Sequence, residues 1–147
     1  MGKLFILSLL VFSTLISNIK TDSYSLTIKT EGLENSKGSV VFALYDKEGT
    51  IPDQKFQKYY RKKSTIIIDE KSEITFNNLP KGLYAVTILH DENNNGKIDT
   101  KFMLPLPDEG VGFSNYDDFG LSNRPNFKKA SFIVNNDTTV VIKVVYK

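Results

Sequence analysis

The segment HDENNNGKIDT (90–100) combines the residue types and the spacing of a calcium-binding loop. Hard cations such as Ca²⁺ bind roughly six to eight oxygen ligands in a flexible cage. With Asp91 as the first loop position, Gly96 falls where such a loop turns sharply. The predicted ligands are the side chains of Asp91, Asn93, Asn95 and Asp99 and the backbone carbonyl of Lys97.

The predicted cage is incomplete, because Phe102 stands where calcium loops of this spacing place a bidentate glutamate. Residues 91–118 contain seven acidic side chains and two lysines, a local charge of −5. We expect either weak binding, at about 10⁻⁴ to 10⁻³ M, or completion of the cage by a carboxylate from later in the chain. The alternative is a tight polar turn, since Asn and Gly tolerate positive φ. The carboxylates that could complete the cage are Asp108, Glu109, Asp117 and Asp118.

No residue pattern requires catalysis, and we expect a non-enzymatic protein. The absence of cysteine excludes thiolate metal sites and a cysteine nucleophile. By strand alternation, His90 points away from Asp91, and we expect it to bond to loop backbone at the end of a strand. Ser114 has no nucleophile-elbow motif and no second histidine to activate it. A hydrolase remains the least favoured reading, and it would use a carboxylate pair among Asp108, Glu109 and Asp117.

The residues after the loop predict a surface for a partner. We expect an ordered segment that exposes Phe113, Ser114, Asn115 and Tyr116, with a cell-surface protein or a carbohydrate as the partner. An alternative is a carbohydrate- or cell-wall-binding module, in which Phe113, Tyr116 and Phe119 form a stacking platform. The net charge of +2 is too small to indicate nucleic acid.

The elements that position these residues are predicted to be strands. Apolar and polar residues alternate with a period of two, and turn residues separate the runs. This pattern predicts an all-β protein, a seven-stranded antiparallel β-sandwich with one short helix and a long ordered loop. The loop covers residues 91–128, and its five aromatics argue against disorder. The runs expected to form strands are YSLTIKT, SVVFALYD, STIIIDE, SEITFNN, GLYAVTILH, KASFIVN and TTVVIKVVYK.

The predicted helix is PDQKFQKYYRKK (52–63). It places Phe56, Tyr59 and Tyr60 at helical spacing, with Asp53 as the cap. We expect these aromatics to pack on the sandwich while the basic side chains stay in water. A cationic or aromatic binding face is the alternative.

The N-terminus predicts export. A basic start at Lys3 precedes an apolar stretch, 4–16, that is shorter than the roughly 20 residues needed to span a bilayer. We interpret 1–22 as a signal peptide, cleaved between about 17 and 23, and 23–147 as a single domain. The protein would then be periplasmic or extracellular, without a membrane span once the signal is removed.

Two motifs carry a resemblance to a known family. FNNLPKGLYAVTILHDENNNGKIDT (76–100) is followed in order by LPDEGVGFSN (106–115) and by FKKASFIV (127–134). Over almost all of 23–147 the chain resembles the exported bacterial family called domain of unknown function 2141. The resemblance implies an immunoglobulin- or prealbumin-like sandwich and no established activity. The chain departs from the family at LPLPDEG, where other members more often have a glycine before the first proline.

A second resemblance concerns the loop. LPKGLYAV (79–86) is similar to B-type repeats of surface adhesins and to regulatory domains of carboxypeptidases, in which a small sandwich is a structural module. Some adhesin repeats of this kind carry DxNxDG loops that bind calcium. That resemblance implies side-chain ligands at Asp91, Asn93, Asn95 and Asp99.

Overall fold

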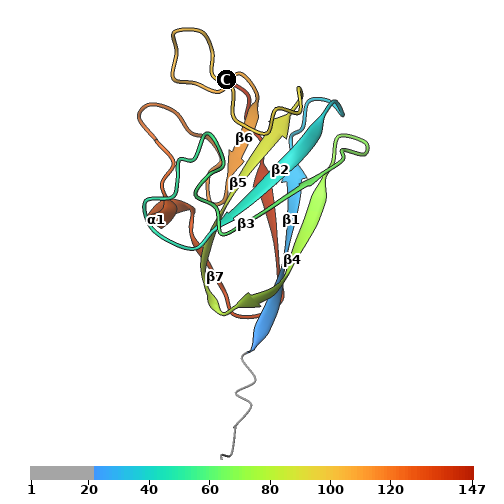
Figure 1. Cartoon of the computed structure of the whole chain (residues 1–147), viewed down its shortest axis with the longest axis vertical. Coiled ribbons are helices and arrows are strands. Elements are labelled where there is room, and N and C mark those ends of the chain that lie inside the picture. The colour runs from blue at the N-terminus through green and yellow to red at the C-terminus, as the bar shows by residue number, and fades with distance from the viewer. Residues whose placement is uncertain (1–21) are drawn as a thin grey trace, which may run out of the picture.

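The computed structural model describes residues 22–147, and the predicted signal peptide lies outside them except for residue 22. Within the described residues, eight strands form two sheets, and one short helix, α1 (Phe127–Ala130), lies beside them (Figure 1). No helix in this part of the chain is long and apolar enough to cross a membrane. The strands are β1 (Ser23–Glu31), β2 (Ser39–Tyr45), β3 (Arg61–Thr65), β4 (Glu73–Pro80), β5 (Gly82–Asp91), β6 (Gly110–Phe113), β7 (Phe132–Val134) and β8 (Thr138–Lys143).

The smaller sheet has the order β4-β1-β8, and the larger has the order β3-β2-β5-β6 with β7 paired to β5. The predicted all-β sandwich is therefore confirmed. The structure adds one strand to the seven expected, because β6 lies inside the segment expected to be loop. It also contains a parallel pair, since β8 runs alongside β1 in the same direction.

The main core lies between the two sheets, where the alternating apolar residues of both meet. Leu26 and Ile28 of β1 face Phe42 of β2 and Ile88 of β5 across it, and all four are fully buried. Each such side chain stabilises the fold by roughly 1.5–3 kcal/mol relative to exposure. The alternation in the sequence therefore reports directly which face of each strand points inward.

A second core lies on the opposite face of the larger sheet. Alternate residues of β2 and β5, such as Ala43 and Leu89, pack there against the irregular segments. This explains why β5 is apolar on both faces: the other sheet covers one, and 98–130 together with 51–56 cover the other. The covering side chains are Ile51, Phe56, Ile98, Phe113, Tyr116, Phe119, Phe127 and Ala130.

The helix predicted at 52–63 is wrong. The Asp53 carboxylate accepts hydrogen bonds from the backbone amides of Gln57 (3.0 Å) and Lys58 (2.8 Å), and so closes a turn. Phe56 adopts a positive φ of 48°, which a helix does not allow, and its ring is buried against the larger sheet. The last three residues of the predicted helix, 61–63, belong to β3.

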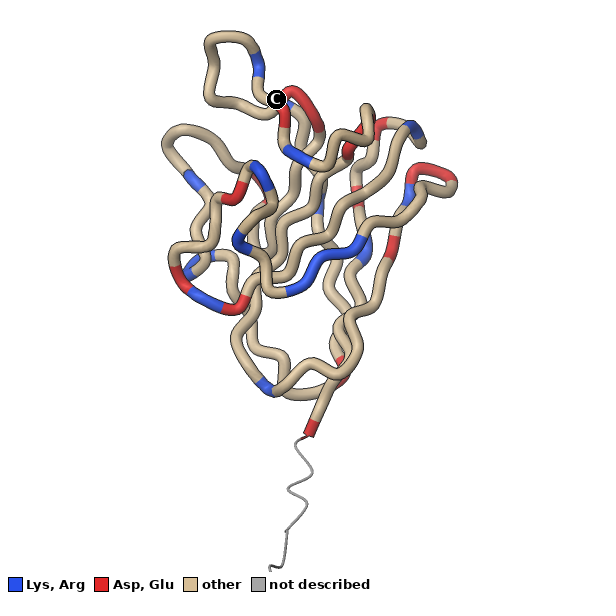
Figure 2. Tube along the Cα trace, in the orientation of Figure 1, with Lys and Arg blue, Asp and Glu red and all other residues tan. Residues whose placement is uncertain are grey.

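Three basic residues of this segment, Arg61, Lys62 and Lys63, lie in β3, as Figure 2 shows. The Arg61 guanidinium donates to the carbonyls of Asn77 (2.6 Å) and Asn78 (3.1 Å), and the Lys63 ammonium donates to Thr75 (2.5 Å). These contacts bridge the edge strands of the two sheets. Charged side chains on an edge strand also disfavour pairing with another chain. The strand expected at 64–70 is found at 61–65 as β3, and 66–71 form a separate turn closed between Ile68 and Lys71.

Candidate metal centre

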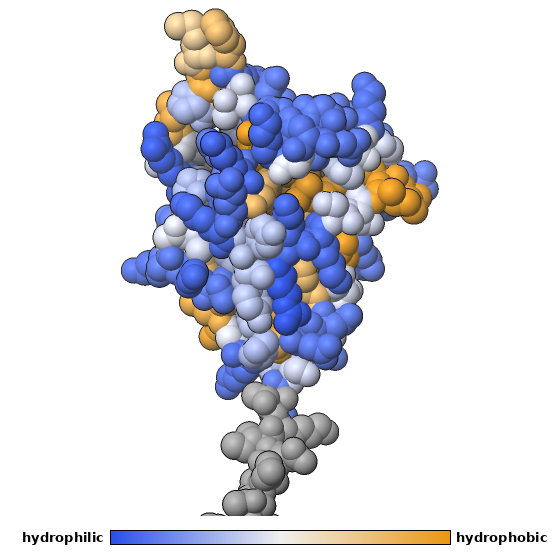
Figure 3. Space-filling view, viewed as in Figure 1, coloured by the Kyte–Doolittle hydropathy of each residue, from blue (hydrophilic) through white to orange (hydrophobic). Residues whose placement is uncertain are grey.

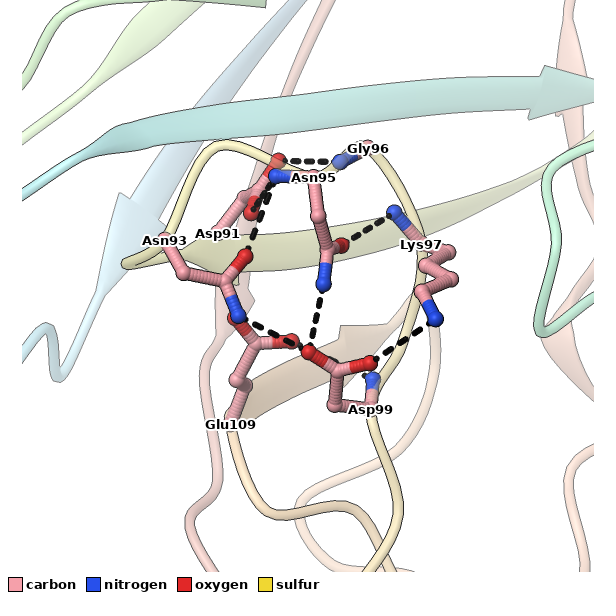
Figure 4. Close-up of polar contacts among 7 residues, drawn as sticks. All are labelled: Asp91, Asn93, Asn95, Gly96, Lys97, Asp99 and Glu109. Carbon is pink, nitrogen blue, oxygen red and sulfur yellow. Dashed lines mark hydrogen bonds and ion pairs between the residues drawn. The ribbon is translucent and has the colours of Figure 1, made fainter.

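The loop begins where β5 ends, and the Asp91 carboxylate organises it. Asp91 is 2% exposed; its Oδ1 accepts from the Asn95 amide (3.0 Å) and its Oδ2 from the Gly96 amide (2.8 Å) (Figure 4). Gly96 has φ of 75°, so the turn predicted at this residue is present. Ile98, two residues on, is buried and anchors the loop to the second core.

The two asparagines and Asp99 converge on one another. Asn93 and Asn95 both donate from Nδ2 to Asp99 Oδ2, at 2.8 Å and 2.5 Å. Their Oδ1 atoms accept from the backbone amides of Asn95 and Lys97, each at 3.0 Å. The hydrogen bond from Asn93 holds the pKa of the Asp99 carboxyl below its usual range, and Asn95 and Lys97 add to the effect. Asp99 therefore stays ionised at neutral pH.

The Lys97 side chain also contacts the candidate site. Its ammonium group lies 3.4 Å from Asp99 Oδ1, so the side chain forms an ion pair with the expected ligand. The structure shows no contact from its carbonyl to the other site residues. The prediction of a carbonyl ligand at Lys97 stays a prediction.

Glu109 is the carboxylate that reaches the loop from later in the chain. It is 7% exposed, and its Oε2 accepts from the Asp99 amide at 3.2 Å. Its Oε1 is buried without a hydrogen-bond partner among residues 22–147. Burial raises the pKa of the Glu109 carboxyl and the charges of Asp99 and Asp91 raise it further, while hydrogen bonding from the backbone of Asp99 and Glu92 offsets part of the rise.

The side chains of the other three acidic residues considered for this role make no hydrogen bond to residues 91–99. Asp108 and Asp117 are exposed, and Asp118 pairs with the Lys147 ammonium at 2.5 Å. Glu109 is set apart because it directly precedes β6, which pairs with β5 from His90 to Thr87. Pairing of these two strands brings Glu109 beside the residues that follow β5.

The arrangement offers hard oxygen donors suited to calcium, from Asp91, Asn93, Asn95, Asp99 and Glu109. Among the described residues, no group of three or more histidine, aspartate or glutamate side chains is already arranged around one point. Amide nitrogens of Asn93 and Asn95 face Asp99 instead. Binding of an ion would exchange these hydrogen bonds for oxygen ligands. The unpartnered Oε1 of Glu109 is the observation that fits such an ion.

His90 has a structural role, and the expected bond to loop backbone is confirmed. The ring is fully buried, with Nε2 2.9 Å from the Lys37 carbonyl and Nδ1 2.6 Å from the Tyr146 hydroxyl. Because a carbonyl only accepts, Nε2 carries the proton of the neutral ring and Nδ1 accepts from Tyr146. The Tyr146 hydroxyl in turn accepts from the Glu34 amide at 3.2 Å. His90 thus joins β5 to the β1–β2 loop and the C-terminus.

A family model described as "Uncharacterized protein conserved in bacteria (DUF2141)" matches residues 28–142. The chain belongs to the DUF2141 family. The matched region includes the whole loop, Glu109 and all eight strands except the ends of β1 and β8. No curated protein matches the chain.

Among solved structures, the chain is similar to a fimbrial assembly protein from Parabacteroides distasonis ATCC 8503. The identity is 13% and the TM-score 0.40, over 85% of this chain and 53% of that one. The chain thus spans about half the length of that protein.

The partner surface expected on this DUF2141 chain is wrong for three of its four residues. Phe113, Ser114 and Tyr116 are 5%, 3% and 5% exposed. The Ser114 hydroxyl accepts from the Val86 amide (2.9 Å) and donates to the Ala130 carbonyl (2.6 Å). Asn115 is exposed, but its amide donates to the Ser131 carbonyl at 2.8 Å. The GFSN motif therefore fastens β6 and α1 to β5.

The aromatic platform is also wrong. Phe113, Tyr116 and Phe119 belong to the second core. The Phe113 ring meets those of Tyr116 and Phe119 edge-on, with interplanar angles of 63° and 85°. A stacking surface for sugars requires exposed, roughly coplanar rings, and these rings are neither.

A cavity of about 160 Å³ lies beside this second core. Its lining is mostly apolar and includes Ile98, Leu106, Val111 and Arg124. Asp108, Glu109 and Asp117, which the hydrolase alternative would use, do not line it. Among the described residues, this cavity therefore does not bring together the carboxylates named for that alternative.

Proposed function

We propose that this DUF2141 protein is an exported, non-enzymatic β-sandwich module whose 91–99 loop is ordered by calcium. Asp91, Asn93, Asn95, Asp99 and Glu109 would hold the ion, with the Lys97 carbonyl as a further ligand. The observation that carries the proposal is Glu109, a buried carboxylate with one unpartnered oxygen beside an ionised aspartate.

The physical argument concerns the cost of that carboxylate. Burying an ionised group is strongly unfavourable unless an opposite charge or hydrogen bonds compensate it. The Glu109 carboxylate accepts a hydrogen bond from the Asp99 amide at 3.2 Å, and the backbone of Glu92 also favours its ionised form, but the negative charges of Asp99 and Asp91 lie near it. The Lys97 ammonium is paired with Asp99. A divalent cation between these carboxylates would remove both the repulsion and the unmet hydrogen-bonding capacity.

The hydrogen bonds of other polar residues support the proposal of a non-enzymatic structural module. His90, Ser114 and Asn115 are all engaged in bonds that tie strands and loops together. An ion that binds the folded state alone would stabilise it by mass action. Affinities of about 10⁻⁴ to 10⁻³ M serve extracellular calcium modules, which agrees with the export expected from residues 1–22.

Thermal melting with calcium or magnesium tests the proposal on the exported protein after chelator treatment. We expect the melting temperature to rise with calcium and to rise less with magnesium, which demands stricter octahedral geometry. Asp99→Asn should abolish the rise, because it removes an ionised ligand. Asp108→Asn, a change at an exposed neighbouring carboxylate, is the matched control and should retain it. Equal rises in wild type and Asp99→Asn would refute the site.

A further inference from the structure

Residues 99–108 form a hairpin that leaves the body of the protein directly from the candidate metal centre. Thr100 and Pro107 pair across it, the Lys101 amide donates to the Leu106 carbonyl at 2.9 Å, and the Asp108 amide donates to the Asp99 carbonyl at 2.9 Å. In Figure 1 this hairpin projects at the end of the molecule opposite the start of β1.

The tip of the hairpin is apolar and fully presented to solvent. Phe102, Met103 and Leu104 are 92%, 86% and 53% exposed. Figure 3 shows the apolar tip as a narrow projection above a hydrophilic body. Three consecutive large apolar side chains held away from the core are unfavourable in water, and such exposure marks an interaction site.

The shape of the tip favours a bilayer over a protein surface. A stable protein interface buries roughly 800 Å² on each partner, with a polar rim around an apolar centre. The tip is a small convex wedge, flanked by Lys101 on one side and Pro105 on the other, and the polar residues Thr100 and Asp108 lie nearer its base. A lipid surface accepts such a wedge without a preformed complementary groove. Lys101 and the exposed Lys97 can meet the phosphate headgroups.

The metal centre lies at the base of the same hairpin. Asp99 precedes the hairpin strands and Glu109 follows them, and the Asp99 amide donates to Glu109 Oε2. Residues 91–109 carry five acidic side chains and two lysines, a charge of −3 that one Ca²⁺ reduces to −1. An ion held by Asp99 and Glu109 would close the base and remove most of the charge that repels an anionic surface.

We propose that the 99–108 hairpin is a calcium-dependent membrane-docking element that inserts Phe102, Met103 and Leu104 into a phospholipid bilayer. This inference rests on the proposed calcium site. The tip supplies the apolar area, the lysines supply headgroup contacts, and the ion sets the position and charge of the base.

The test is flotation of the exported protein with vesicles of phosphatidylethanolamine and phosphatidylglycerol in equal parts, in calcium and in chelator. We expect wild type to float with the vesicles in calcium and to stay below in chelator. The Phe102→Ser, Met103→Ser variant should lose vesicle affinity at least about tenfold, because each buried side chain contributes a large part of the binding energy. Its melting temperature should still rise with calcium, because the tip lies outside the site.

The Ile66→Ser, Ile68→Ser variant is the matched control, since these side chains are 67% and 63% exposed away from the hairpin. It should float like wild type. A calcium-dependent rise in melting temperature without flotation would overturn docking while leaving the calcium site intact. Calcium-dependent dimers in sedimentation without flotation would also overturn it, by assigning the tip to a second copy. Equal flotation in chelator would overturn the dependence on calcium.

Discussion

Asp99 and Glu109 lie ten positions apart in the sequence, and the Asp99 amide donates to Glu109 Oε2 at 3.2 Å. The pKa values of their carboxyl groups shift in opposite directions. Hydrogen bonding lowers the pKa of Asp99, whereas burial and neighbouring charge raise the pKa of Glu109. This contact joins the loop that follows β5 to the start of β6, which pairs with β5. The predictions about calcium depend on this contact.

Glu109→Gln should stabilise the metal-free protein at neutral pH. The folded state binds a proton at Glu109 more tightly than the unfolded state, so this carboxyl lowers stability as the pH rises through its folded pKa. Removing the charge should raise the free energy of unfolding by about 1 kcal/mol, the scale of one poorly satisfied buried group. Chemical denaturation in chelator measures this. A Glu109→Gln variant less stable than wild type in chelator would show that the carboxylate is already compensated.

Calcium affinity should fall as the pH decreases. Binding requires both carboxylates ionised, and Glu109, with its raised pKa, protonates first, while Asp99 stays ionised to lower pH. Below the folded pKa of Glu109 the affinity should drop about tenfold per pH unit for one proton displaced. Titrations at several pH values, with the protons released measured in buffers of different ionisation heat, check this. Affinity that is constant down to the ordinary range of glutamate would exclude Glu109 as a ligand.

His90 should contribute to stability without contributing to calcium binding. His90→Phe removes a fully buried ring that bonds to both the Lys37 carbonyl and the Tyr146 hydroxyl, and should cost about 1–3 kcal/mol. Tyr146→Phe removes one hydroxyl from the same network and should cost about 1 kcal/mol. Denaturation curves give both values, and the calcium response should persist in both variants. If either variant kept full stability but lost the response, the histidine would belong to the metal site.

Ser114→Ala should destabilise the fold by about 1–3 kcal/mol, because it leaves the buried Val86 amide without its side-chain acceptor. The same change should leave calcium and vesicle binding unaltered, since Ser114 is only 3% exposed. Ser122→Ala, at an exposed position, is the matched control. A Ser114→Ala variant of wild-type stability would mean that the hydroxyl has another role.

The strands of the sandwich and the centre of the loop could be predicted from sequence because both depend on local spacing. Alternation places Leu26 and Ile28 inward, and the contacts of Asp91 with Asn95 and Gly96 span at most five positions. From the sequence, Glu109 is one of four acidic residues that could complete the cage, and local spacing does not distinguish it from the other three. Glu109 reaches the loop because β6 pairs with β5, and the two glycines of β6 make this strand hard to recognise in the sequence. Gly112 is required there, since a Cβ at this position would lie 2.5 Å from the Lys143 carbonyl.

The burial of Phe113, Ser114 and Tyr116 was missed although a signal exists. Both faces of β5 are apolar, so each face must be covered. The smaller sheet covers only one of them. The aromatic-rich segment that follows is the cover. The prediction of a helix at 52–63 is wrong because the spacing of the aromatics does not reveal the turn that Asp53 closes. Its carboxylate accepts from the backbone amides of Gln57 and Lys58.

Isothermal titration of chelator-treated wild type with calcium, beside Glu109→Gln, tests the central proposal most directly. We predict heat in wild type with a Kd of about 10⁻⁴ to 10⁻³ M, and none in Glu109→Gln. At ten times Kd the ion should add about 1.4 kcal/mol of stability, or roughly 4–6 °C in melting temperature. Absence of heat in wild type up to several times the weak end of that range would contradict the account and leave HDENNNGKIDT as a polar turn.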